Sequence, residues 1–472
     1  MIDRILRDRA RSTPGRVAID DGARAWTYAE LDARAEELAP CFGHGERVAT
    51  LTGSSAEHVA IFFACARAGA ILLPLSWRLS PRELAFQLDD AEPSLLLAEP
   101  GYEPLAREAL ALASVTPARE PGAGIPSDNL SLGGPAPDDP LLLVYTSGTT
   151  GRPKGALLTH ANCFWTNLSF DLATGISGDD VVLGVLPQFH VGGWNVQPLL
   201  AWWKGATVVL EREFEPARAL HLIEERRVTT MMGVPATYLF MANEPGFERA
   251  DLSSLRRAVV GGAPMPEALL QTWQRRGVAI VQGYGLTEAA PNVLCLAPED
   301  AVRRTGWAGK PYPHVDVRLS AEGELQVRGP NVFPGYWRNP GATAEALTED
   351  GWLRTGDLAE ADAEGNYRIR GRLKDIVISG GENVYPAEVE AALHEHPAVV
   401  EAAVVGRSDA TWGEVCVAFV VLRGPADEDE LVAHCRERLA RFKVPKEVRF
   451  VEALPRSAMN KVLKDELRAV LA

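Results

Sequence analysis

The chain has 472 residues, of which 46% are hydrophobic and 24% charged, the proportions of a soluble globular protein. Its 48 Lys and Arg residues against 63 Asp and Glu residues give a formal net charge of −15, which argues against a nucleic-acid partner. No apolar run approaches the roughly 20 residues that span a bilayer, and no secretory signal is visible. The six cysteines lack C-x-x-C spacing, which excludes a zinc ribbon and a disulfide framework. We expect a cytoplasmic protein with reduced thiols, no structural metal and no integral membrane span.

The N-terminal two thirds of the chain alternates strand and helix patterns. Residues 1–40 are expected to form a helix, a strand and a second helix, which Thr27 and Glu30 begin as a capping box. Strand–helix units follow at 47–68 and 70–88, and residues 115–140, rich in Pro, Gly, Ser and Asp, are expected to form a loop before a buried strand at 141–145. Further units run from residue 181 to about 257. This alternation predicts an α/β fold with mostly parallel sheets covered by helices.

The pattern changes after about residue 306. Short antiparallel strands are expected at 315–319, 324–328 and 366–369, as a small barrel-like part of the larger domain. From residue 375 the order is strand, helix (386–394), two strands, helix (428–439), strand and terminal helix, which predicts a small α+β domain. We therefore expect an N-terminal domain of residues 1–373 and a C-terminal domain of residues 374–472.

The segment 145–155, with the sequence YTSGTTGRPKG, follows an apolar strand. Its glycines permit turns in which backbone N–H groups converge, its hydroxyls add donors, and Lys154 adds a positive charge. These features suit a polyphosphate. The segment is not a Walker motif, because no G-x-x-x-x-G-K-[ST] register fits.

The complete segment resembles the glycine-rich motif of the adenylate-forming enzymes, which include acyl-CoA synthetases, adenylation domains of peptide synthetases and firefly luciferase. Six further motifs agree in order and spacing: GGAP at 261–264, GYGLTE at 283–288, WLRTGD at 352–357, GRLKD at 371–375, GGENVYP at 380–386 and PRSAMNK at 455–461. The resemblance covers essentially the whole chain. It implies that a carboxylic acid attacks the α-phosphate of ATP to give an acyl-adenylate and pyrophosphate, and that coenzyme A then captures the acyl group.

The resemblance assigns the ATP site motif by motif. The β- and γ-phosphates would be bound by Thr146, Ser147, Gly148, Thr149, Thr150, Gly151 and Lys154. Gly262, Ala263 and Pro264 would approach the adenine, on which Tyr284 would stack beside Gly285. Thr287 would bind the α-phosphate and Glu288 would hold Mg²⁺, which favours carboxylate oxygen. Asp357 would accept hydrogen bonds from the ribose, and Arg372 would reach the ribose or a phosphate.

The C-terminal domain is implied to be mobile. Lys461 would bridge the acid and the α-phosphate, with Asn460 in place of the usual glycine before it. Lys374 aligns with the family's hinge, about which the domain rotates between the two half-reactions. In the second pose Gly380, Gly381 and Glu382 would bind coenzyme A.

The acid pocket is expected from segments 190–195, 234–238, 260–262 and 283–291, which contain neither Lys nor Arg. Its expected acyl-binding residues are His190, Trp194, Asn195, Val234, Gly261 and Gly283. His190 joins Lys461, Thr287 and Glu288 as a candidate catalytic residue. A fatty acid is the first expectation, and an aryl or cyclic acid is the alternative.

The same sequence bears on other functional classes. His394 and His396 stand two positions apart on an expected helix and cannot share a zinc ion, and no G-x-S-x-G elbow indicates a hydrolase. A separate carrier protein as acyl acceptor, a luciferase-like oxygenase and a non-catalytic nucleotide-binding module remain open alternatives. So does a homodimer.

Overall fold

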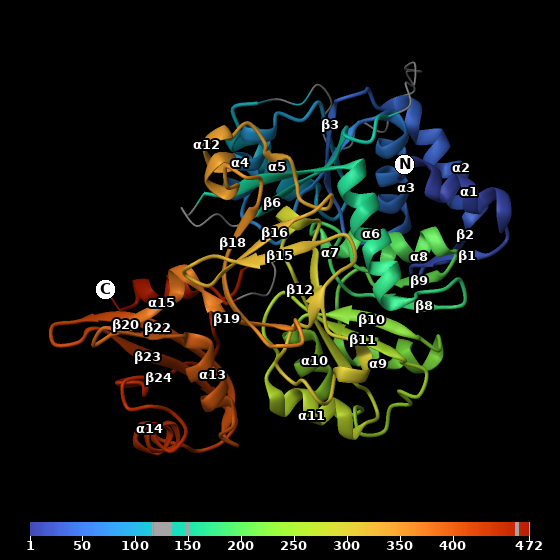
Figure 1. Cartoon of the computed structure of the whole chain (residues 1–472). Coiled ribbons are helices and arrows are strands. Elements are labelled where there is room, and N and C mark those ends of the chain that lie inside the picture. The colour runs from blue at the N-terminus through green and yellow to red at the C-terminus, as the bar shows by residue number, and fades with distance from the viewer. Residues whose placement is uncertain (116, 118–134, 147–151, 458–461, 472) are drawn as a thin grey trace.

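The computed structural model describes residues 1–115, 117, 135–146, 152–457 and 462–471, in which the chain forms a large N-terminal part and a smaller C-terminal part (Figure 1). Within the described residues, the N-terminal part is built on two mainly parallel sheets. Their strand orders are β14-β13-β12-β11-β10-β8-β9-β1-β2 and β17-β7-β6-β4-β3-β5. The first sheet comprises β1 (Val17–Asp20), β2 (Ala25–Thr27), β8 (Val181–Gly184), β9 (Thr207–Leu210), β10 (Thr230–Gly233), β11 (Arg257–Val260), β12 (Ile280–Gly285), β13 (Asn292–Cys295) and β14 (Lys310–Pro311). The second comprises β3 (Arg47–Leu51), β4 (Ile71–Pro74), β5 (Leu95–Ala98), β6 (Pro140–Thr146), β7 (Lys154–Thr159) and β17 (Gly335–Tyr336).

Helices cover both faces of both sheets. The layer between the sheets contains α1 (Asp3–Ser12), α2 (Tyr28–Leu38), α3 (Ala56–Ala68), α6 (His160–Thr174), α7 (Gly192–Asn195) and α8 (Pro198–Lys204). The outer face of the first sheet packs against α9 (Pro216–Glu225), α10 (Pro235–Ala242) and α11 (Glu267–Arg275). The outer face of the second sheet packs against α4 (Pro81–Ala91) and α5 (Glu103–Leu112). The helix α3 is buried along nearly its whole length, because apolar layers surround it.

A curled antiparallel sheet joins this body to the C-terminal part. It has the order β15-β16-β18-β19, formed by β15 (Asp316–Leu319), β16 (Glu324–Arg328), β18 (Leu353–Ala361) and β19 (Tyr367–Arg372). The helix α12 (Pro340–Ala346) lies between β17 and β18 in the chain. A bridge between Gly309 and Tyr367 continues the curl toward β14. This sheet is the barrel-like part that the sequence predicts.

The C-terminal part has a core of its own. Its sheet contains β20 (Val377–Ser379), β21 (Glu382–Val384), β22 (Val399–Asp409), β23 (Gly413–Leu422) and β24 (Glu447–Phe450). One face packs against α13 (Pro386–His394) and α14 (Glu428–Arg436), and the other packs against α15 (Lys464–Ala469). The predicted α/β class with a small α+β C-terminal part is therefore confirmed. The boundary at residues 373 and 374 stays a prediction; there a 3-10 turn, Leu373–Asp375, connects β19 to β20.

Some sequence predictions of individual helices and strands are confirmed, and others are wrong. The capping box of α2 is present, with Thr27 Oγ1 accepting from the Glu30 N–H at 3.2 Å and Glu30 accepting from the Thr27 N–H at 2.7 Å. The helix expected to reach residue 439 ends at Arg436. The sequence does not predict β18, because Gly356, with φ of 69°, interrupts its alternating pattern. Most of the loop expected at 115–140 lies outside the described residues. Among the described helices, none is both long and hydrophobic enough to cross a bilayer.

A buried carboxylate joins three strands of the first sheet. Asp180, just before β8, accepts hydrogen bonds from Thr229 Oγ1 at 2.6 Å and from the Ser177 N–H at 2.8 Å. Arg256 and Arg257, at the start of β11, lie 2.9 and 3.1 Å from Asp180 Oδ1. Burial alone would raise the pKa of Asp180, but these hydrogen bonds and the Arg257 charge outweigh it and lower the pKa.

We predict that Asp180→Asn lowers the free energy of unfolding at pH 7 by about 2 kcal/mol. The reason is that a neutral amide takes the place of the carboxylate that accepts the charge-assisted hydrogen bonds. Since the folded pKa is lowered, the stabilisation is complete above the ordinary aspartate value of about 3.9 and is lost as pH falls through the folded value. Urea unfolding at pH 7 and at about pH 3 measures both effects. The matched control is Asp179→Asn, whose side chain is 90% exposed, and equal losses in the two variants would contradict this role of Asp180.

Candidate active site

The hairpin of β12 and β13 carries the GYGLTE motif. A Cβ atom on Gly285 would lie 1.7 Å from the carbonyl oxygen of Pro291, so only glycine fits at this crossing. Directly after β12 the chain forms a 3-10 turn, Thr287–Ala289, in which Thr287 is buried. This hairpin therefore fixes Tyr284 and Glu288 on either side of a tight backbone contact.

Tyr284, Asp357 and Arg372 form one cluster, and their roles in binding ATP stay predictions. The Tyr284 hydroxyl donates to Asp357 Oδ2 at 2.6 Å, and Arg372 Nε donates to Asp357 Oδ1 at 3.1 Å. Asp357 and Arg372 stand opposite each other on β18 and β19. Burial and then the Asp357 charge raise the pKa of Tyr284 well above its usual value, so the phenol stays a neutral donor. The cluster offers a carboxylate, a cation and an aromatic ring at one point.

A second cluster contains Thr146, Lys154 and Glu288. Thr146 and Lys154 are paired at the ends of β6 and β7, and Thr146 Oγ1 lies 3.5 Å from Glu288 Oε1. The Lys154 ammonium lies 5.3 Å from the centre of the Tyr336 ring. Ser147, Gly148, Thr149, Thr150 and Gly151, between the paired strands, lie outside the described residues. Their phosphate role stays a prediction, but of their described neighbours Thr146 contacts Glu288 and Lys154 lies over the Tyr336 ring.

Glycines occupy the carboxyl ends of three adjacent parallel strands. Gly233 ends β10, Gly261 follows β11, and Gly283 lies near the end of β12. The Gly261 N–H donates to the Gly233 carbonyl at 3.3 Å, and a Cβ on Gly261 would lie 3.4 Å from the Gly283 oxygen. Thr237 lies over Gly233 and Met232 over Gly261, each 2.9 Å from where a Cβ would stand, whereas a Cβ on Gly283 would meet nothing closer than 3.7 Å. Gly262, Ala263 and Pro264 are exposed at the end of β11, and Val234 is half-buried beside Gly262.

The expected acyl-binding residues of segment 190–195 divide into two groups. His190 is half-buried, and its Nδ1 accepts from the Gly192 N–H at 3.1 Å. Trp194 is fully buried, stacks on Phe62 at 4.6 Å and donates its Nε1–H to the Gln188 carbonyl. Asn195 is fully buried as well and contacts Asn167 and Cys163. The structure thus places Trp194 and Asn195 in the core, and their direct contact with an acid stays a prediction.

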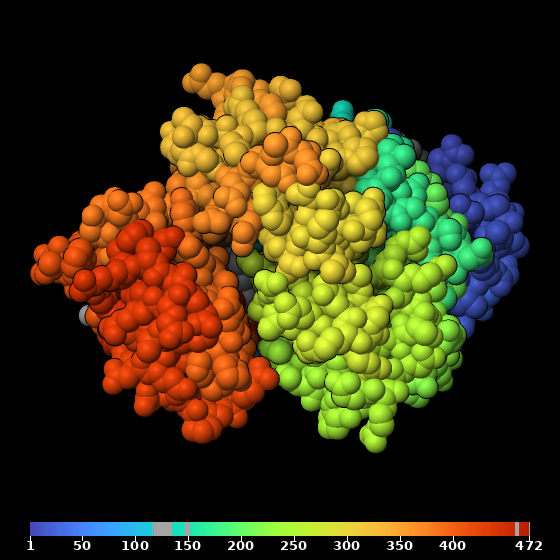
Figure 2. All heavy atoms as spheres, turned by 60° about the horizontal axis from the view of Figure 1, so that its bottom comes forward, coloured from blue at the N-terminus to red at the C-terminus, as the bar shows by residue number. Residues whose placement is uncertain are grey.

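The residues predicted for coenzyme A and for the hinge lie in or just before the C-terminal part. Gly380 and Gly381 have φ of 61° and 85° and form the exposed turn between β20 and β21, next to Glu382. Lys374 pairs with Asp465 of α15 at 3.4 Å. Lys461 lies outside the described residues. Figure 2 shows a cleft between the C-terminal part and the part that carries α9 to α11.

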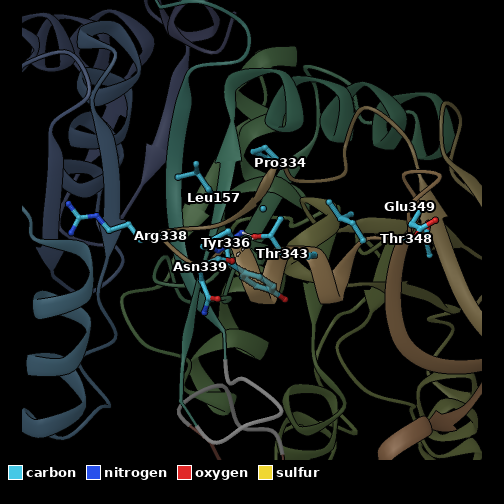
Figure 3. Close-up of a pocket in the computed structure, with 12 residues that line it drawn as sticks. Leu157, Pro334, Tyr336, Arg338, Asn339, Thr343, Thr348 and Glu349 are labelled. Carbon is cyan, nitrogen blue, oxygen red and sulfur yellow. Dashed lines mark hydrogen bonds between the residues drawn. The ribbon is translucent and has the colours of Figure 1, made fainter.

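Tyr336 is a site residue that the sequence does not predict. Its hydroxyl donates to Glu288 Oε1 at 2.8 Å, although 48 positions separate the two residues. No spacing rule connects residues so distant; the pairing of β17 with β7 and the hydrogen bond from the Phe333 N–H to the Glu288 carbonyl bring them together. Tyr336 also lines an open hollow of about 630 Å³ with Leu157, Asn339 and Thr343 (Figure 3). None of the predicted acyl-binding residues lines this hollow.

Comparisons with known proteins agree with these motifs. Family models match residues 6–337 as an AMP-binding enzyme and residues 388–461 as an AMP-binding enzyme C-terminal domain. The chain is 42% identical to a feruloyl-CoA synthase of Amycolatopsis sp, covering 98% of this chain and 97% of that protein. It is 43% identical to an indoleacetate–CoA ligase of Aromatoleum aromaticum, covering 97% and 96%.

A solved structure is similar over the same length. It is the o-succinylbenzoate CoA synthetase of Bacillus subtilis in complex with its acyl-adenylate intermediate, with a TM-score of 0.90, 34% identity and 98% coverage of both chains. These relatives are all ligases that join an acid to coenzyme A, and the match extends over both parts of the chain. The protein therefore belongs to the AMP-binding, adenylate-forming enzymes and is an AMP-forming acid–thiol ligase.

Proposed function

We propose that the protein is an aryl-acid–CoA ligase, which activates an aromatic carboxylic acid as its adenylate and transfers it to coenzyme A. Its substrates are ATP, coenzyme A and a small carboxylic acid, and its metal is Mg²⁺. A fatty acid, the first expectation from the sequence, is less well supported than the aryl alternative, because the relatives named above act on feruloyl and indoleacetate groups.

The observation that carries this proposal is the space beside Gly283, near the carboxyl end of β12, where an added Cβ would meet nothing closer than 3.7 Å. A planar ring can lie against backbone that carries no side chain at van der Waals distance. Met232 adds a flexible thioether whose Cε lies 2.9 Å from where a Gly261 Cβ would stand, and sulfur packs well beside aromatic rings. The four predicted pocket segments contain no Lys or Arg, so a second carboxylate on the acid would lack a partner.

The two clusters would bind ATP along its length. Asp357 would accept from the ribose hydroxyls while Arg372 holds its carboxylate in place. Lys154 and Thr146 would bind the outer phosphates, and Thr287 would donate to the α-phosphate. The acid oxygen then bonds to the α-phosphorus as the bond to pyrophosphate breaks. In the second half-reaction the thiol sulfur of coenzyme A bonds to the acyl carbon, its proton leaves, and AMP departs.

The donor set at Glu288 fits magnesium. The Glu288 carboxylate has the Thr146 hydroxyl 3.5 Å away, and hard oxygen donors are what Mg²⁺ prefers. Glu288 would hold the ion against the phosphates. Bound there, Mg²⁺ supplies positive charge that offsets the repulsion between the acid and ATP.

We predict that ferulic and indoleacetic acids give kcat/KM values at least about tenfold above those of octanoic and palmitic acids, a difference of about 1.4 kcal/mol. The reason is that a flat ring would contact the backbone at Gly283 over its whole face. Pyrophosphate release, measured with and without coenzyme A over a panel of acids, tests this. Equal or better turnover of the fatty acids would refute the aryl assignment.

A matched pair of glycine variants tests the space beside Gly283. In Gly283→Ala the new methyl meets nothing closer than 3.7 Å, so the fold accepts it, but it would raise the KM for the aryl acid and leave the KM for ATP unchanged. Gly246→Ala, where the methyl has no neighbour within 4 Å, is the control and should behave as wild type.

The two half-reactions should separate if the C-terminal domain rotates about Lys374. Lys461→Ala should abolish adenylate formation, because it removes the bridging cation, yet still convert a supplied acyl-adenylate to the thioester. Lys374→Pro should do the reverse, because proline fixes φ at the pivot. Each half-reaction is measured alone. Equal loss of both half-reactions in both folded variants would rule out rotation about this residue.

A further inference from the structure

Residues 330–336, here called the brace, are held to the body of the domain at several points. Asn162 of α6 donates its amide N–H groups to the Pro330 and Val332 carbonyls, each at 2.9 Å. Asn331 is buried and donates to the carbonyls of Ala289 and Asn292 at 2.9 and 3.0 Å. The brace is therefore tied both to the central helix layer and to the residues that flank the turn carrying Glu288.

The far end of the brace is equally fixed. Tyr336 pairs with Ala156 of β7, and its backbone N–H donates to Thr343 Oγ1 of α12 at 2.9 Å. Its ring meets the Phe333 ring edge-on at 4.9 Å. A phenol held by its backbone and by a neighbouring ring has little rotamer freedom, so the position of its hydroxyl is defined.

The brace contacts Glu288 twice. The Phe333 N–H donates to the Glu288 carbonyl at 2.9 Å, and the Tyr336 hydroxyl donates to the Glu288 carboxylate at 2.8 Å. With Oε1 engaged, the carboxylate keeps one orientation and presents Oε2 for a further bond.

We propose that Tyr336 is a positioning residue that aims the Glu288 carboxylate at the magnesium ion of MgATP and, through its ring face, holds Lys154 beside the same ion. The proposal rests on the proposed role of Glu288. The Lys154 ammonium, 5.3 Å from the ring centre, is within cation–π range. One side chain would thus orient both the carboxylate that holds the metal and the cation that binds the phosphates.

Calorimetric titration of the protein with α,β-methylene-ATP, once in Mg²⁺ and once in EDTA, tests the positioning role of Tyr336 without catalytic turnover. We expect Tyr336→Phe, which removes only the hydroxyl, to reduce the Mg²⁺-dependent gain in affinity about tenfold and to leave the Kd in EDTA unchanged. Tyr336→Leu should in addition weaken binding in EDTA, because Lys154 loses the ring. Mn²⁺ binding measured by electron paramagnetic resonance should weaken in both variants.

Tyr102→Phe is the matched control, since Tyr102 also donates to a glutamate, Glu213 at 3.2 Å, on another part of the surface. It should bind Mg²⁺ and nucleotide as wild type does. Glu288→Gln distinguishes the metal-binding role of Glu288 from the positioning role of Tyr336. If Glu288→Gln keeps the full Mg²⁺ effect, the metal role of Glu288 is wrong and the inference fails with it. If Glu288→Gln loses the effect and Tyr336→Phe does not, only the positioning role is overturned.

Discussion

The contact between the Gly285 backbone and the Pro291 carbonyl is the constraint on which the candidate site depends. Any side chain at Gly285 would overlap that oxygen, so the chain can cross itself here only at a glycine. The crossing turns Tyr284 toward Asp357 and, four residues later, Glu288 toward Tyr336. Both ends of the proposed ATP site are therefore set by one backbone crossing rather than by separate loops.

Charge is distributed so that an acidic chain can still receive a polyanion. The net charge of −15 would repel ATP at long range, but Lys154 and Arg372 place positive charge at the site. Arg372 is held by Asp357, and Lys154 by the Tyr336 ring rather than by a carboxylate. An aromatic face orients a cation without neutralising it, so the Lys154 charge would remain available to a phosphate in the proposed site.

The sequence predicts helices and strands well where the hydrophobic periodicity agrees with the capping and turn residues at their ends. Strands such as β3 and β4 are short apolar runs followed by capped helices, and the capping box at Thr27 marks its helix correctly. β18 is missed because Gly356 breaks the alternation, although it carries Asp357. The motifs place Tyr284, Asp357 and Arg372 in one site before any distance is known. Tyr336 and the burial of Trp194 depend on contacts between distant segments, which no local pattern encodes.

The turn at Leu373–Asp375 has a mechanical consequence. Asp375 pairs with Arg468 of α15 at 2.5 Å, so the residue after Lys374 is tied to the C-terminal core. On the other side, Arg372 is tied to Asp357 of the body. Only Leu373 and Lys374 lie between these two anchored residues. If the C-terminal part rotates here as proposed, so short a connection would restrict it to a small number of orientations.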